Sequence, residues 1–172
     1  GGGVGPLASI IIDKYKPKYY VLSDIPHSLF LAYNELTKKF PNSTFYFNEN
    51  FIDLEKYLSN NSNKTLIIFS LPWNIDKLIS KLNYQKSKFI SHYSLQALND
   101  TELKNIDKMI LRAKFDYFWY SGYHLKFNKV VKSPIKNLEQ YKSYNWKQIE
   151  QEALHLVGNV EDKVNLIGYR KI

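Results

Sequence analysis

The chain of 172 residues contains no cysteine, which excludes disulfide bonds and metal sites built on thiolates. It also contains no apolar run that approaches the ~18 residues of a membrane-spanning helix. Both features are compatible with the reducing cytoplasm, where we expect the protein to act. We therefore consider globular folds that need neither cross-links nor a bilayer.

Arginine is scarce, because Arg112 and Arg170 are the only two among 24 basic residues. The 16 acidic residues leave a formal net charge of +8, which raises the question of an anionic partner. The lysines, however, are scattered through every segment, whereas proteins that bind nucleic acid tend to gather Lys and Arg on one face. We interpret the charge as solvated surface and do not expect a nucleic-acid partner.

Glycine occurs seven times, and four of the seven lie within residues 1–5. Closely spaced glycines let the backbone adopt positive φ and approach a bulky ligand, and Pro6 suits the first turn of a helix. A glycine turn that opens a helix aims backbone N–H groups at a nucleotide-like cofactor. Glycines left by an expression tag are the alternative. If the turn is genuine, we expect the fold to lack in this chain the strand that normally precedes it.

The segments after this turn alternate between helical and extended patterns. Such alternation predicts an α/β protein with a Rossmann-like, doubly wound, mostly parallel sheet that carries helices on both faces, here as a single domain over residues 1–172. The first half predicts helices beginning at Pro6 and Pro26, a short helix within 51–58, and strands at 19–22, 44–47 and 65–69. The helix from Pro6 is apolar nearly all round, which predicts burial against the sheet.

The second half continues the pattern less regularly. Asn99, followed by Glu102 three residues on, indicates a capped helix start. Trp146, Ile149, Ala153 and Leu156 recur at helical spacing before Gly158, which predicts a last amphipathic helix. The other expected elements are a helix at 76–82 and strands at 89–93, 115–120 and 164–169.

Asp24 follows the strand predicted at 19–22, about 20 residues after the glycines. Dinucleotide-type folds place at this distance the carboxylate that accepts hydrogen bonds from the ribose hydroxyls of the cofactor. A helix cap is the simpler role for the same residue. With the glycines at the matching distance, we favour the ribose role.

Several of these segments resemble the bacterial putative sugar O-methyltransferase family, a branch of the class I S-adenosylmethionine-dependent methyltransferases. The resemblance extends to about Tyr120 and is carried by residues 1–5, 20–26, 67–73 and 89–96. It implies a Rossmann-like sheet, S-adenosylmethionine as methyl donor, and a sugar hydroxyl in a polysaccharide or other glycan as acceptor. It further implies that Gly1, Gly3 and Gly5 approach the methionine part of the cofactor and that Asp24 binds its ribose.

One position departs from the family pattern. The family motif reads Ser, a large apolar residue, Gln, Glu and Met, whereas residues 94–98 place Ala97 where the acidic residue is expected. If that carboxylate serves catalysis or binding, this chain has lost it. The chain could therefore be a diverged enzyme or one of weakened activity.

Methyl transfer to a hydroxyl needs alignment of donor and acceptor, and an unactivated hydroxyl also needs a base or a metal ion. His92 is the best-placed base, near the carboxyl end of a predicted strand, although a histidine satisfied by local hydrogen bonds is an equal alternative. No spacing of His, Asp and Glu indicates a metal site. We further expect Ser94, Gln96 and His124 at the acceptor and Pro72 and Trp73 at the cofactor, with burial in the core as the alternative for Trp73.

Two other functions compete with methyl transfer. Residues 3–8 also fit the GxGxxG/A turn of a nicotinamide dehydrogenase, with Ala8 as its last member. A non-catalytic Rossmann-like module that binds a partner or nucleic acid through its positive charge is the third possibility, and it predicts binding that weakens steeply with salt.

Overall fold

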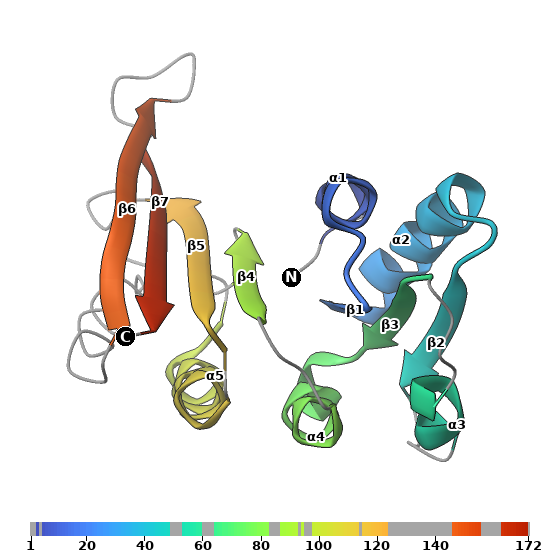
Figure 1. The fold of residues 1–172 in the computed structure, drawn as a ribbon. Helices are drawn as coiled ribbons and strands as arrows, with labels where there is room; N and C mark the ends of the chain where they lie inside the picture. The colour runs from blue at the N-terminus through green and yellow to red at the C-terminus, as the bar shows by residue number, and fades with distance from the viewer. Residues whose placement is uncertain are drawn as a thin grey trace. The chain divides into compact units, whose positions relative to one another are not determined.

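The computed structural model describes residues 3, 5–48, 53–59, 64–82, 87–92, 94, 98–113, 115–123, 146–155 and 163–171. The chain divides into two compact units, Gly1–Asn83 and Tyr84–Ile172, and each unit contains its own sheet (Figure 1). The expectation of a single domain over residues 1–172 stays a prediction.

The first unit alternates helices with parallel strands, as the sequence predicts. Its three-stranded sheet has the order β1-β3-β2, and all three strands run parallel. Pro6 and Pro26 stand at the first positions of α1 and α2, where a missing backbone N–H costs nothing. The elements are α1 (Pro6–Tyr15), β1 (Tyr19–Ser23), α2 (Pro26–Lys39), β2 (Thr44–Asn48), α3 (Leu54–Ser59), β3 (Leu66–Ser70), the 3-10 turn η1 (Pro72–Asn74) and α4 (Ile75–Lys81).

The central strand β3 is buried along its whole length because helices cover both faces of the sheet. Ile67 and Phe69 pack with residues of α1 and α2, whereas Leu66 and Ile68 pack with residues of α3 and α4. This alternation is the two-residue period of a strand, which sends successive side chains to opposite faces. Figure 1 shows α1 and α2 on one side of this sheet and α3 on the other. The expected covering of both faces is confirmed.

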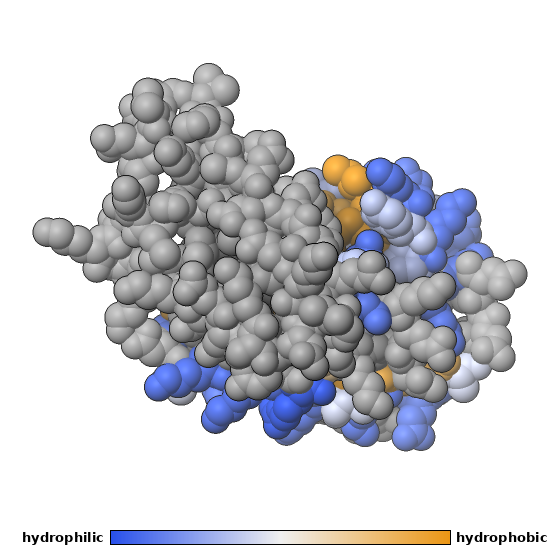
Figure 2. Space-filling model, turned by 60° about the vertical axis from the view of Figure 1, so that its left-hand side comes forward, coloured by the Kyte–Doolittle hydropathy of each residue, from blue (hydrophilic) through white to orange (hydrophobic). Residues whose placement is uncertain are grey.

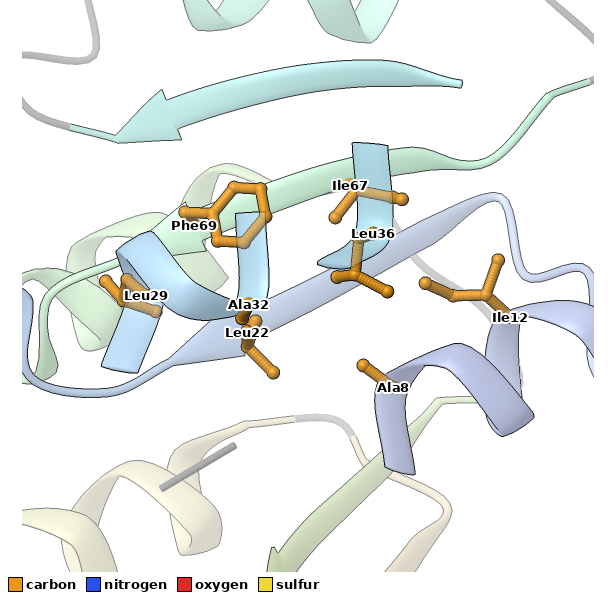
Figure 3. Close-up of a cluster of buried hydrophobic side chains, with 8 residues drawn as sticks. All are labelled: Ala8, Ile12, Leu22, Leu29, Ala32, Leu36, Ile67 and Phe69. Atoms are coloured by element: carbon orange, nitrogen blue, oxygen red, sulfur yellow. The ribbon is translucent and has the colours of Figure 1, made fainter. Parts of the chain in front are cut away.

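The core between the sheet and the first two helices is made of aliphatic side chains around one aromatic ring. Gly5, just before α1, faces α2, and a Cβ at Gly5 would lie 3.4 Å from the Cα atom of Ala32, at ordinary contact distance. Lys39 of α2 also donates a hydrogen bond to the buried hydroxyl of Ser9 in α1. The buried members are Ala8, Ile12, Leu22, Leu29, Ala32, Leu36, Ile67 and Phe69 (Figure 3).

Burial of α1 is less complete than its sequence suggests. Ala8, Ser9 and Ile12 are buried, but the side chain of Ile10 is 60% exposed. A helix that packs on a sheet buries only the stripe that faces the sheet, so an apolar residue on the other side stays in solvent. The expected burial of this helix against the sheet is confirmed for the stripe of Ala8 and Ile12, and Ile10 lies outside that stripe.

The phenol of Tyr20 makes the stability of this unit depend on pH in the alkaline range. The ring packs against the α1–α2 side of the core, and burial raises the pKa of its phenol to about 12. Because the pKa is raised in the folded state, the contribution of Tyr20 to stability is fully present below pH ~10, the pKa of an unfolded tyrosine. This contribution is lost as the pH rises toward ~12. We expect the difference in unfolding free energy between wild type and Tyr20→Phe to change by about 2–3 kcal/mol between pH ~9 and ~12. Urea denaturation across this range measures it, and parallel pH dependence of the two proteins would contradict it.

The second unit contains a mixed four-stranded sheet in the order β4-β5-β7-β6. Strands β4 and β5 are parallel and are connected through α5, whereas β7 runs antiparallel to both β5 and β6. The predicted cap of α5 is confirmed: the Asn99 side chain accepts from the N–H groups of Thr101 and Glu102, and the Glu102 carboxylate accepts from the Asn99 N–H. The elements are β4 (Lys88–His92), α5 (Asp100–Arg112), β5 (Tyr117–Tyr123), β6 (Trp146–His155) and β7 (Lys163–Lys171).

The last helix predicted from Trp146 to Leu156 is wrong. Residues Trp146–His155 form β6, which pairs with β7 over its length. The register shifts between Gln148 and Glu150, so one extra residue interrupts the two-residue alternation that marks a strand. Apolar residues three and four apart then imitate a helix, and pairing with β7 decides the conformation.

Candidate functional site

The candidate site begins at the carboxyl edge of the β1-β3-β2 sheet. Ser23 and Ser70, the last residues of β1 and β3, lie opposite each other in the register. Asp24 follows the first strand directly, and Pro72 and Trp73 follow the second after a single leucine. Since ligands of open α/β sheets bind beyond the carboxyl ends of the strands, these side chains occupy the edge at which chemistry is expected.

The half-buried carboxylate of Asp24 joins this edge to the glycine turn. Its Oδ2 accepts a hydrogen bond of 2.9 Å from the Gly3 N–H, and its Oδ1 accepts one of 2.7 Å from the Ile25 N–H. Gly3 is exposed with φ +58°, and a Cβ there would have no neighbour within 4 Å. The glycine turn and the carboxylate therefore lie together, with open space above Gly3. That both bind a cofactor stays a prediction.

Gly5 has a different environment from Gly3. It is buried, precedes the first residue of α1 with φ +104°, and accepts the Ser9 N–H at 2.8 Å through its carbonyl. A Cβ at Gly5 would meet Ala32 of α2 at ordinary contact distance, so the positive φ favours glycine here and only a side chain larger than a methyl group would press on α2. Gly1, the remaining glycine predicted at the cofactor, lies outside the described residues.

Pro72 and Trp73 form the short turn η1 after β3. The Asn74 N–H donates to the carbonyl of Leu71 at 2.9 Å, which closes the turn. The indole of Trp73 is 68% exposed, so its predicted alternative role in the core is wrong. An exposed indole at the carboxyl edge is available to stack on a planar ligand.

The described residues on the face drawn in Figure 2 are mostly hydrophilic, with small apolar areas between them. Ile25 is 57% exposed beside Asp24, and with Trp73 it adds apolar surface to the carboxyl edge of the sheet. A carboxylate, backbone amides and exposed apolar groups at one sheet edge suit a ligand that combines a polar sugar with a flat ring.

The second unit carries the predicted base and part of the predicted acceptor site. His92 is the last residue of β4, and its backbone lies opposite Ser121 of β5. Ser94 follows, and its Oγ lies 2.9 Å from the Oγ of Ser91, whose side chain is 3% exposed. The side chain of His92, and Gln96, Ala97 and His124, lie outside the described part of the chain.

Ser91 is a residue that the sequence did not single out. A serine within an extended segment is an ordinary strand residue, and its only local signal is a second serine three positions later. The hydroxyl pair becomes visible only in the structure, where the Oγ atoms of Ser91 and Ser94 lie 2.9 Å apart near the end of β4.

Two kinds of feature are not found among the described residues. No group of three or more His, Asp or Glu side chains there is arranged to hold a metal ion. None of the helices that the structure describes has the length and apolar character that a bilayer crossing requires.

No protein-family model matches the sequence, and no curated protein matches it either. Solved structures do match. The N-methyltransferase NodS from Bradyrhizobium japonicum WM9 superimposes with a TM-score of 0.60 at 9% identity, over 99% of this chain and 82% of NodS. Magnesium protoporphyrin IX methyltransferase (ChlM) from Synechocystis PCC 6803, solved with bound SAM, gives 0.58 at 10% identity, over 100% of this chain and 67% of that one.

This chain has the fold of Rossmann-like methyltransferases. A further match, aTrm5 in its complex with tRNALeu, has a TM-score of 0.52 at 14% identity, and this chain spans 39% of it. Identities this low establish the architecture, so the cofactor and the acceptor have to be argued from the residues of this chain. The predicted α/β, Rossmann-like fold is confirmed.

Proposed function

We propose that this protein is an S-adenosylmethionine-dependent methyltransferase that methylates a sugar hydroxyl in polysaccharide or glycan synthesis. The observation that carries the proposal is the hydrogen bond between the Gly3 N–H and the Asp24 carboxylate. It brings the two predicted cofactor-binding elements into contact at the carboxyl edge of a parallel sheet, in a methyltransferase-type fold. The sugar acceptor is supported by the family resemblance of the sequence.

The residues at this edge suit an adenosyl group. A carboxylate has about four acceptor positions, so two bonds to backbone amides leave capacity for the ribose hydroxyls. The open space above Gly3 suits the methionine part, and the exposed indole of Trp73 beyond Pro72 suits stacking on adenine. When bound, the cofactor supplies an activated methyl group on a sulfonium.

His92 is the proposed base of this reaction. At the carboxyl end of β4 it would accept the proton of the acceptor hydroxyl, which raises the nucleophilicity of the oxygen as the methyl group is transferred. Ser94, held by the buried hydroxyl of Ser91, and Gln96 and His124 are proposed to bind the acceptor. Ala97 places no carboxylate in this segment, so the base has to come from elsewhere, and His92 is our proposal for it.

Isothermal calorimetry with S-adenosylhomocysteine tests the cofactor assignment. We expect the protein to bind S-adenosylhomocysteine and not NAD⁺, and Asp24→Ala to weaken that binding by at least about tenfold, because a charged hydrogen-bond acceptor for the ribose is lost. Asp13→Ala is the matched control, since it removes an exposed carboxylate from the last turn of α1. Binding of NAD⁺ without S-adenosylhomocysteine would instead support a dehydrogenase.

Transfer of a labelled methyl group tests the acceptor. Panels of sugars and nucleotide sugars, of small amines, and of RNA are incubated separately with labelled S-adenosylmethionine and the protein. We expect label in the sugar panel as a methyl ether. Label confined to the amines or to RNA would contradict the sugar assignment and leave the cofactor assignment intact.

A further inference from the structure

The Asp24 carboxylate binds two backbone amides that come from different parts of the chain. Ile25 is the next residue, so its N–H orients the carboxylate relative to the end of β1. Gly3 stands 21 residues earlier, so its N–H attaches the glycine turn to that same carboxylate. One side chain thereby links the turn before α1 to the loop between β1 and α2.

Gly3 needs such a link more than its neighbour Gly5 does. Gly3 is exposed and has no neighbour within 4 Å of the position that a Cβ would take, and glycine has more backbone freedom than any other residue. Gly5 is held by the first turn of α1 and by Ala32, but Gly3 lies before that helix. Among the described residues, Asp24 is the partner that the structure gives to Gly3.

We infer that Asp24 is a positioning residue, which holds the glycine turn in its binding shape before any cofactor is present. This role is additional to the ribose contact and acts through the backbone of Gly3. Its consequence for affinity rests on the proposed function, because the turn is there assigned to the methionine part of S-adenosylmethionine. Its consequence for the shape of the glycine turn does not rest on the proposed function.

Replacing Asp24 with asparagine should affect the positioning of the glycine turn and the contact with the ribose differently. The turn requires two acceptor oxygens, because both of its partners are N–H donors. Asparagine has one acceptor and one NH₂ donor, so in the Asp24→Asn variant the NH₂ group must oppose either the Gly3 or the Ile25 N–H. A ribose hydroxyl both donates and accepts, so an amide side chain still serves it. Asp24→Asn therefore affects the turn more than the ribose.

The first test uses the ligand-free protein and the amide signal of Gly3 in ¹H–¹⁵N NMR spectra. We expect this signal to move upfield in Asp24→Asn and Asp24→Ala, because the amide proton loses its charged acceptor. Asp13→Asn, the same substitution at an exposed position of α1, should leave it in place. An unchanged Gly3 signal in both Asp24 variants would overturn the inference, whether or not the protein binds S-adenosylmethionine.

The second test compares two ligands by calorimetry. Adenosine contains the ribose and the base, whereas S-adenosylhomocysteine also contains the amino-acid part that the turn would hold. We expect Asp24→Asn to weaken S-adenosylhomocysteine about tenfold more than adenosine. Equal losses for both ligands would show that Asp24 acts on the ribose alone and would overturn the positioning role. Failure of wild type to bind either ligand would contradict the proposed function, and the NMR result would then decide the inference alone.

Discussion

Replacing Phe69 with alanine is expected to lower the free energy of unfolding of the first unit by about 3–5 kcal/mol. Phe69 is 1% exposed on β3, the central strand of its sheet. Its ring lies 4.9 Å from that of Phe47 and 6.3 Å from that of Phe45, stacked on both, and meets Tyr33 edge to face at 5.9 Å. Removing the ring leaves a cavity under α2 and separates these aromatic partners. Urea denaturation followed by circular dichroism measures the loss.

Phe30→Ala is the matched control for this prediction. The same ring is removed, but Phe30 is 61% exposed on α2. We expect a loss below about 1 kcal/mol, because little apolar surface returns to water and no cavity forms. Equal losses at Phe30 and Phe69 would show that the β3 core does not carry the stability that its burial indicates.

Gly5→Val is expected to lower the free energy of unfolding by about 3 kcal/mol, through two separate costs. The backbone at Gly5 has φ +104°, a conformation that a β-branched residue avoids. A Cβ at this position already reaches contact distance of Ala32, at 3.4 Å from its Cα and 3.6 Å from its Cβ. The two methyl groups of valine beyond that Cβ then have to push α1 away from α2. Thermal and urea denaturation of the variant measure the combined effect.

Two further substitutions separate the costs. Gly5→Ala adds only the Cβ, which fits at ordinary contact distance, so we expect about 2 kcal/mol from the backbone conformation alone. Gly3→Val places the same side chain in open space at φ +58°, where about 1–2 kcal/mol is expected. If Gly3→Val destabilised the protein as much as Gly5→Val, contact with Ala32 would not explain the cost of valine at position 5.

Much of the first unit could be predicted because its signals are local. Pro6 and Pro26 mark helix starts, and the buried run around Ile67 and Ile68 has the composition of a strand covered on both faces. The same is true of the cap at Asn99, where two side chains satisfy backbone groups within four residues. Interactions that close over so short a distance leave their pattern in the sequence.

The strand β6 could not be predicted because its conformation comes from a distant partner. Its hydrogen bonds are made with β7, from Trp146 paired with Lys171 to His155 paired with Lys163. The shift between Gln148 and Glu150 removes the regular alternation that would have revealed a strand. Spacing within one segment therefore pointed to a helix, and cross-strand pairing overrode it.

The charge distribution is a second property that the linear order conceals. The lysines are scattered along the sequence, but helices of a βαβ unit run opposite to the strands, so the ends of α1 and α2 and the starts of β1 and β3 meet at the amino edge of the sheet. The Leu66 N–H donates to the Lys18 carbonyl at 3.0 Å across this edge. The lysines that stand at these helix ends and strand starts in the sequence are Lys14, Lys16, Lys18, Lys38, Lys39 and Lys64.

The sequence by itself determined the alternation of helices and strands, the glycine turn, and the distance of Asp24 from it, because each depends on residue type and short spacing. Only the tertiary structure decided that Asp24 accepts the Gly3 N–H, that Gly5 faces Ala32, that Trp73 is exposed, and that residues 146–155 form a strand. These features depend on which surfaces meet after the chain has closed loops of many residues. Propensity and periodicity act within a single segment and carry no information about its distant partner.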